Sequence, residues 1–275
     1  AQGLYLLEER RTPEGFVKAD PVTVKIDSIG QMQMVKMLND HTKVEFEKYT
    51  LDEGKRTLLA GAGFALYEAV IDEDGQYHRG QEVDTWESSD GNIYRGFVSA
   101  FEEMYRDYGT AGRKVLWNVD GHEYMAEYVS HQQIDASISG GEHSLFPTSA
   151  DIRFRTDKGE EFRIVVYEQQ DSRQGRDFVC EYQFDYKTLG NVNSRAVSYV
   201  TIDGMRRMDY LPVGKRYVLA ELRPPQGYGT VPDKVITVEE TVQVQRHSIL
   251  NQDSSLLISK CVKDGQKELA GAYLA

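Results

Sequence analysis

The stretch YLLEERRTPEGF, residues 5–16, returns 212 positions later as YVLAELRPPQGY, residues 217–228. The two copies keep one register without a gap well beyond this stretch. Identical residues fall on each other at Tyr5 and Tyr217, Glu9 and Glu221, Pro13 and Pro225, Gly15 and Gly227, Asn39 and Asn251, and Lys48 and Lys260. A recurrence at a fixed period indicates tandem modules.

The period runs from the middle of one module to the middle of the next. It predicts the end of a preceding module at residues 1–42, a complete module at 43–252 and the start of a third at 253–275. Within these parts, apolar and polar residues alternate along short segments separated by Pro and Gly turns. This pattern predicts a mainly β protein built of tandem immunoglobulin-like or prealbumin-like β-sandwich modules.

The complete module spans about twice the roughly 100 residues that a sandwich needs. We therefore expect an inserted α+β subdomain at about residues 76–200. Its apolar residues follow helical spacing from Phe97 to Tyr108, and Gly109 then ends the pattern. Residues 152–167 predict a hairpin, and the alternation from Phe178 to Tyr186 predicts a half-buried strand.

The composition excludes several classes of partner. The chain of 275 residues has a formal net charge of −12, so nucleic acid and anionic membrane are poor partners for it as a whole. No apolar run approaches the roughly 18 residues of a membrane helix. The two cysteines, Cys180 and Cys261, suggest no disulfide framework. No cofactor is expected, and no metal site, because the His122-Glu123 pair lacks a second histidine at zinc-protease spacing.

Three of the repeated residues carry complementary chemistry. The first and last strands of a sandwich can pair side by side, which would set the amine of Lys48 against the carboxamide of Asn251. Burial disfavours the charged forms of a lysine and of a carboxylic acid, so it would leave a free amine and a neutral Glu221. Such an acid could polarise the carboxamide and move protons while ammonia leaves, so that an amide crosslink forms.

The plainer alternative treats the same residues as ordinary surface groups. In that reading Lys48 and Lys260 are solvated strand lysines, Glu9 and Glu221 are surface acids, and Asn39 and Asn251 are turn residues, as is usual for these residue types. The alternative holds well for any one of them alone. It does not account for all three types in one register across two copies.

The chain resembles a family in two linked signatures. Lys48 followed by LAGAGFALY at 59–67, together with YVLAELRPPQGY at 217–228, resembles the SpaA-type prealbumin-like modules, relatives of the collagen-adhesin B-type repeats of Gram-positive surface proteins and pilins. The resemblance implies an isopeptide bond between Lys48 and Asn251 with Glu221 as the catalytic acid. It assigns Glu9 and Asn39 to the preceding module and Lys260 to the next one. It does not cover the insertion.

The expected function follows from this resemblance. It implies a structural stalk segment of a cell-wall-anchored protein on the outside of a Gram-positive bacterium, stiffened by self-made crosslinks and contacting adjacent modules of its own chain. Because each bond forms once, the protein is not expected to be a turnover enzyme. The alternative is an adhesin in which the inserted subdomain binds a host matrix protein or glycan.

Overall fold

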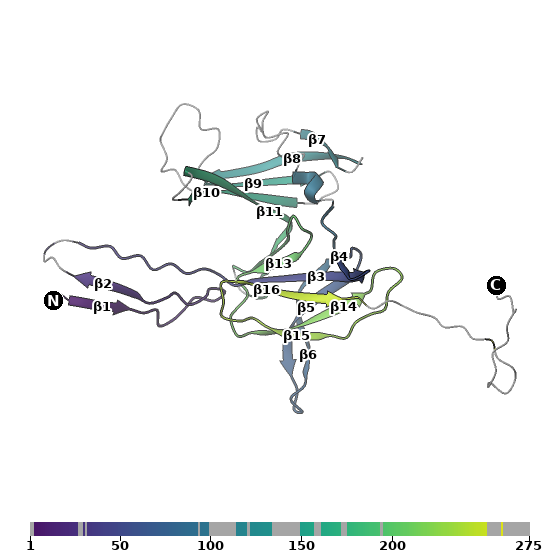
Figure 1. Ribbon diagram of the computed structural model, residues 1–275, viewed down its shortest axis with the longest axis horizontal. Helices are drawn as coiled ribbons and strands as arrows, with labels where there is room; N and C mark the ends of the chain where they lie inside the picture. The colour runs from purple at the N-terminus through teal and green to yellow at the C-terminus, as the bar shows by residue number, and fades with distance from the viewer. Residues whose placement is uncertain are drawn as a thin grey trace.

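The computed structural model describes residues 3–26, 30, 32–92, 94–98, 114–119, 122–133, 149–156, 161–171, 175–192, 195–251 and 260. This part of the chain is mainly β and forms a sandwich-like module with further strands attached to it (Figure 1). No helix in it is long and apolar enough to cross a membrane. Its strands are β1 (Gly3–Leu7), β2 (Val22–Ile26), β3 (Lys43–Asp52), β4 (Lys55–Leu58), β5 (Gly63–Ile71), β6 (Tyr77–Glu87), β7 (Lys114–Val119), β8 (His122–Gln133), β9 (Ser149–Thr156), β10 (Glu161–Asp171), β11 (Gly175–Thr188), β12 (Val197–Val200), β13 (Arg206–Asp209), β14 (Arg216–Arg223), β15 (Lys234–Thr237) and β16 (Val244–Leu250).

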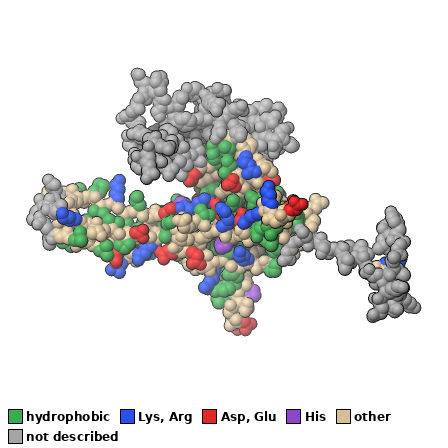
Figure 2. Space-filling view, in the orientation of Figure 1, with side chains coloured by type: hydrophobic (Ala, Val, Ile, Leu, Met, Phe, Trp, Pro, Cys, Tyr) green, Lys and Arg blue, Asp and Glu red, His purple; other side chains and the backbone are tan. Residues whose placement is uncertain are grey.

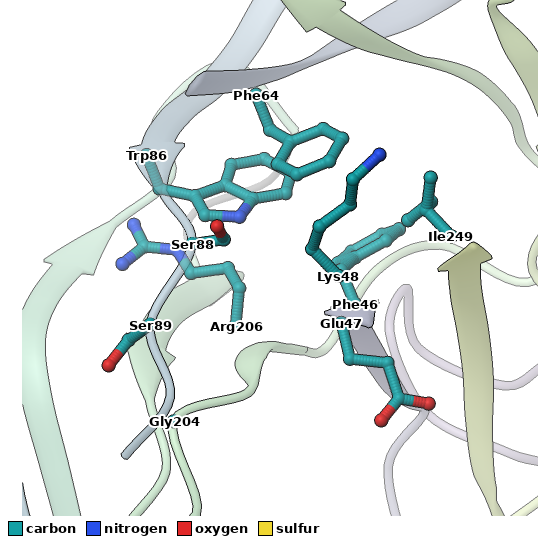
Figure 3. Close-up of a pocket in the computed structure, with 10 residues that line it drawn as sticks. All are labelled: Phe46, Glu47, Lys48, Phe64, Trp86, Ser88, Ser89, Gly204, Arg206 and Ile249. Atoms are coloured by element: carbon teal, nitrogen blue, oxygen red, sulfur yellow. The ribbon is translucent and has the colours of Figure 1, made fainter. Parts of the chain in front are cut away.

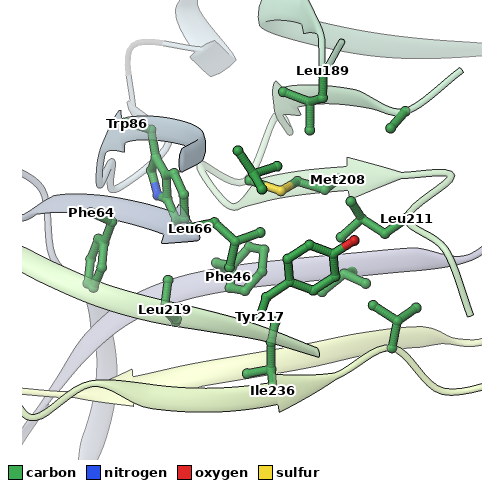
Figure 4. Close-up of a cluster of buried hydrophobic side chains, with 14 of the residues drawn as sticks. Phe46, Phe64, Leu66, Trp86, Leu189, Met208, Leu211, Tyr217, Leu219 and Ile236 are labelled. Carbon is green, nitrogen blue, oxygen red and sulfur yellow. The ribbon is translucent and has the colours of Figure 1, made fainter. Parts of the chain in front are cut away.

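Two sheets make the sandwich. One contains the order β16-β3-β13-β12, and the other is β15-β14-β5-β6. The strands β3 and β16 pair in parallel although the whole module separates them in sequence, so the first and last strands lie side by side as expected. Apolar side chains from both sheets fill the space between them (Figure 4). Among them are Phe46, Leu66, Met208, Tyr217 and Leu219.

Strand alternation decides which residues of β3 enter this core. Successive side chains of a strand point to opposite faces, so Val44, Phe46 and Lys48 share one face. Val44 and Phe46 belong to the apolar cluster, and Lys48 is 1% exposed. The lysine therefore occupies a core position by register.

The repeat in the sequence reappears as a repeat in structure. In the hairpin β1-β2, Leu4 pairs with Lys25 and Leu7 with Val22. In β14-β15, the residues 212 positions later pair in the same way, Arg216 with Thr237 and Leu219 with Lys234. The turns also agree, because the amide that follows each Pro-x-Gly sequence donates to the proline carbonyl at 3.2 Å.

The N-terminal segment, defined as residues 3–42, exposes much of its apolar surface. Leu4, Leu6, Met32, Met34 and Leu38 are 60–97% exposed. Apolar side chains accordingly lie on the visible face of this elongated arm (Figure 2). A two-stranded sheet has no second layer with which to cover such a face.

Two parts of the span expected to be the insertion belong instead to the sandwich. The strand β6 pairs with β5, and β12 pairs with β13. Val83, Trp86, Leu189 and Ala196 lie in the apolar cluster. The chain thus leaves the sandwich only after β6 and returns to it at the end of β11.

The insertion also continues a sheet of the sandwich. The strand β11 pairs with β12, and β10, β9, β8 and β7 follow in order, so a single 10-stranded sheet runs through both parts. The expected hairpin is present as β9-β10 and the expected strand as β11. Helix is found at residues 92 and 94–98, whereas most of the expected helical stretch lies outside the described residues.

These boundaries predict how deletions behave. Removal of residues 76–200 should abolish cooperative unfolding, because it takes β6 and β12 out of the core. Replacement of residues 92–184 by a flexible linker of about six residues should leave a folded module, since both sheets of the sandwich remain. Thermal unfolding followed by circular dichroism distinguishes the two. A molten second variant would show that the insertion supplies indispensable core.

Candidate functional site: a buried lysine, glutamate and asparagine

The candidate site is built around the side chain of Lys48. This side chain is fully buried, and its Nζ lies 2.8 Å from Oε1 of Glu221, which is also fully buried. The approach lacks hydrogen-bond alignment, so both atoms are without a hydrogen-bond partner. Two groups that would be charged in water thus meet inside the core, where unpaired charge is strongly unfavourable.

Glu221 is held in place from its other oxygen. Its backbone pairs with Phe64 across β14 and β5, and the register shifts immediately beyond it. The amide of Val231 donates to Oε2 at 2.9 Å. One carboxylate oxygen is therefore fixed by the backbone while the other faces the lysine.

Asn251 follows directly after β16. Its amide donates to the carbonyl of Tyr49 at 2.8 Å, and Ile249 pairs with Lys48 in the parallel ladder. Because alternation returns to the same face after two residues, Asn251 shares the core face of Ile249 and Lys48. The residue is 5% exposed, and neither Nδ2 nor Oδ1 has a hydrogen-bond partner.

The walls of the site are largely aromatic. The amine of Lys48 projects toward Phe64 and Ile249, while neighbouring Glu47 points the opposite way (Figure 3). The Nζ atom of Lys48 lies 6.0 Å from the centre of the Phe64 ring. The cavity beside it, lined also by Trp86, has a volume of about 10 Å³. That is room for about one water molecule, so bulk water is excluded.

One lining residue of this cavity, Arg206, belongs to a buried ion pair that sequence reasoning missed. Arg206 is 1% exposed, donates to Asp84 through Nε and Nη2, and lies 5.8 Å from the ring centre of Trp86. Burial alone would raise the pKa of Asp84, but Arg206, Lys187 and Ser198 together hold it below its ordinary value. An alternating pattern gives no sign that a core position of β13 holds an arginine.

The earlier copy shows a related arrangement, in which the asparagine itself bonds to the glutamate and Lys18 acts on that glutamate only through its charge. Asn39 Nδ2 donates to Glu9 Oε2 at 2.7 Å, and the amide of Ala19 donates to the same oxygen at 2.9 Å. Ala19 is the repeat equivalent of Val231, so the backbone clamp on the glutamate is shared. The hydrogen bonds from Ala19 and Asn39 lower the pKa of Glu9.

The remaining predicted residues lie apart. Lys260 is exposed and outside any strand, and its neighbours in sequence lie outside the described residues, so its assignment to a next module stays a prediction. Cys261 also lies outside them, as does the side chain of Cys180. In the part of the chain that is described, no cluster of three or more His, Cys, Asp or Glu residues could hold a metal ion.

Comparison with known proteins finds likeness only among solved structures. No protein-family model matches, and a search of curated proteins gives no match. The shaft pilin SpaA from Lactobacillus rhamnosus GG aligns over 93% of this chain and 66% of the pilin chain, with 13% identity and a TM-score of 0.26. A streptococcal ancillary pilin aligns over 92% and 76%, with 15% identity and a TM-score of 0.17. The Bacillus anthracis TIE protein aligns over 91% and 42%, with 15% identity and a TM-score of 0.17.

The ion pair between Arg206 and Asp84 predicts how the stability of the fold depends on acid pH. Asp84→Asn should destabilise the fold by about 2–3 kcal/mol at pH 7, because it removes the buried carboxylate that accepts from Nε and Nη2 of Arg206 and leaves the guanidinium only the exposed carboxylate of Asp185, 2.7 Å from Nη1. The fold holds the pKa of Asp84 below its ordinary value. The contribution of Asp84 to folding stability is therefore complete above the pKa of an unfolded aspartate, about 4, and is lost as pH falls through the lower pKa of the folded state.

Urea unfolding of both proteins between pH 7 and pH 3 checks this. The difference between parent and variant should be constant down to about pH 4 and shrink below it. Asp72→Asn, at an exposed hairpin tip, is the control and should change stability little. A difference that grew as pH fell would contradict the assignment.

Proposed function

We propose that this chain is a stalk segment of a Gram-positive cell-surface protein, whose sandwich module is locked by an isopeptide bond between Lys48 and Asn251. Glu221 is the acid that assists its formation. The surface location rests on the resemblance of the repeated signatures. The bond rests on the chemistry of the buried site.

One observation carries the proposal. The amine of Lys48, on β3, and the carboxamide of Asn251, directly after the paired strand β16, are both buried without hydrogen-bond partners, and a carboxylate lies 2.8 Å from the amine. Each buried polar group without a partner costs about 1–3 kcal/mol. Bond formation would relieve this, because the new amide N–H can donate to Glu221 and the charged amine disappears.

The reaction balances without any added reagent. Glu221 accepts a proton from the Lys48 ammonium, and the free amine attacks Cγ of Asn251. The C–N bond forms as the carbonyl becomes an oxyanion. When the carbonyl re-forms, the bond to Nδ2 breaks and the proton held by Glu221 passes to the leaving nitrogen. The products are one secondary amide and one ammonia, and Glu221 is then free to accept the proton left on the new amide nitrogen.

Exclusion of water supports this role in two ways. A cavity of about 10 Å³ leaves little room for hydrolysis of the product. The aromatic and aliphatic walls also offer the amine no hydrogen bond, so they do not compete with Glu221 and Asn251 for it. Phe46, Phe64, Trp86 and Ile249 supply these walls.

The exposed apolar face of the N-terminal segment fits the same proposal. It would be covered by the rest of a preceding module, whose lysine would meet Glu9 and Asn39. That pair is already assembled as an acid and an amide in hydrogen-bond contact at 2.7 Å.

The crosslink predicts a loss of mass. The intact protein should weigh one ammonia less than its sequence, and a protease digest should contain a branched peptide that joins Lys48 to Asn251. Glu221→Gln should fold but keep the full mass, since packing survives while proton transfer does not. The control is Glu9→Gln, the repeat equivalent, which should still lose ammonia. Linear Lys48 and Asn251 peptides from folded parent protein would refute the bond.

The crosslink also predicts a loss of stability when it is prevented. A tie between residues 48 and 251 closes a loop of about 200 residues, for which chain entropy gives about 5 kcal/mol. Glu221→Gln and Asn251→Ala should therefore both unfold at lower denaturant than the parent, and Glu221→Gln by the larger amount, because it also leaves the buried amine of Lys48 without its carboxylate. If the uncrosslinked variants matched the parent in chemical denaturation, the bond would have no stabilising role.

A second candidate function is adhesion through the inserted strands. A cavity of about 520 Å³ lies between the base of β10-β11 and the sandwich, lined by Arg163, Glu181, Tyr186, Arg195 and Tyr210 among others. This volume suits a small ligand or the end of a glycan. Binding of the whole chain to panels of host glycans and matrix proteins tests it. A ligand whose binding is abolished by Tyr186→Ala would favour the adhesin.

A further inference from the structure

The N-terminal segment meets the sandwich at one close backbone contact. Gly15 has φ of +79°, and a Cβ built on it would lie 2.4 Å from the carbonyl oxygen of Tyr210 and 2.9 Å from its carbonyl carbon. Tyr210 itself has φ of +64°, a conformation that is strained for a bulky residue and persists only where its surroundings fix it. Only glycine fits the turn side of this contact.

Hydrogen bonds fix the contact from both sides through Thr42. Its amide donates to the carbonyl of Gly15 at 3.0 Å, and its carbonyl accepts from the amide of Tyr210 at 3.1 Å. Its hydroxyl donates to the carbonyl of Leu211 at 2.6 Å. Thr42 and Leu211 are fully buried. The segment is therefore bonded to the sandwich and does not merely lie against it.

Aromatic rings surround the same point. The ring of Tyr210 stacks on His41 at 4.2 Å and meets Phe16 edge-on at 5.3 Å. The guanidinium of Arg195 lies 5.3 Å from the ring centre of Phe16. His41 Nε2 is also 3.5 Å from Asp209.

The repeat supplies a second copy of this turn in a different state. Gly227 is the equivalent of Gly15 and has φ of +89°, yet nothing lies within 4 Å of a Cβ built on it. Gly15 is buried whereas Gly227 is exposed. The two turns share the Pro-x-Gly-aromatic sequence, the register and the backbone conformation. They differ because Tyr210 packs against the turn at Gly15, whereas no described residue packs against the glycine of the turn at Gly227.

We propose that the Pro-x-Gly-aromatic turn of each module is a docking surface for the tyrosine loop of the module that follows it. The turn at residues 13–16 holds the loop at 209–211. The turn at residues 225–228 is the matching surface for the equivalent loop of a following module. The assignment of this contact to successive modules rests on the proposed stalk function.

Such a joint supplies a property that a crosslink inside a module does not. A bond between the first and last strands limits extension of its own module, but it leaves the angle between neighbours undefined. Only three residues, 40–42, separate Asn39 from β3, and the joint bonds them on both sides. Consecutive modules are thereby held at a fixed angle, which makes the array stiff in bending.

Matched glycine variants test the observed joint in the whole chain. Gly15→Ala and Gly227→Ala introduce the same left-handed strain, but only the first inserts a Cβ into Tyr210. Gly15→Ala should raise the hydrogen-exchange rates of the Thr42 and Tyr210 amides by about tenfold or more, and Gly227→Ala should leave them unchanged. Equal rates in the two variants would overturn the joint.

Tyr210→Ala is a control that distinguishes loss of the joint from unfolding of the N-terminal segment. It removes the two ring contacts from the sandwich side and leaves the turn intact. Exchange at Thr42 should rise while exchange in β1 and β2 stays as in the parent. An unchanged rate at Thr42 would count against the joint. The intact mass of each variant reports the crosslink separately, so failure of one proposal is distinguishable from failure of the other.

A tandem protein tests the open surface. The first copy is residues 1–251, and a second copy of residues 40–275 follows it directly. Asn251 is thus followed by residue 40, as its equivalent Asn39 is in the natural chain. Only the first copy is labelled with nitrogen-15, so that its peptides can be told from those of the second. Exchange of the labelled turn at 225–231 should slow by about tenfold relative to the single chain, and Gly227→Ala in the first copy should cancel the slowing. Exchange equal to that of the single chain would refute the docking surface.

Discussion

The contact between Lys48 and Glu221 is the constraint around which the sandwich is organised. Taking an amine and a carboxylate out of water is unfavourable unless each finds the other, so the two strands that carry them must keep their register. A shift of β3 by one residue would turn the lysine outward and bring Glu47 into the core. The parallel pairing with β16 then brings Asn251 to the same face.

Much of this arrangement could be predicted from the repeat. The 212-residue period predicted tandem modules, and in the structure the two hairpins share one register and a backbone amide bonds each glutamate at equivalent positions. Pairing of the first and last strands was also expected. These features depend on local sequence patterns or on the pairing that closes a sandwich, and both can be predicted from one sequence.

Long-range pairing was less accessible. The insertion was expected to be separate, but β11 adds to β12 and extends a sheet of the sandwich. Alternation predicts strands and does not say which strand lies beside which, so the boundaries at 76 and 200 fell inside β-sheet pairs. The Arg206–Asp84 pair was missed for a related reason. Its partners are 122 positions apart and neither belongs to a repeated motif.

The short path from Asn39 to Lys48 has a consequence for length under tension. If the proposed bond forms in each module, a pulled array would transmit force through the nine residues from 39 to 48, cross the amide to residue 251 and enter the next such segment. Nine extended residues span about 30 Å, whereas the 212 residues of a full period would span about 700 Å. The remaining strands, the insertion and its cavity lie outside this path, so they could diversify without altering how far such an array would stretch.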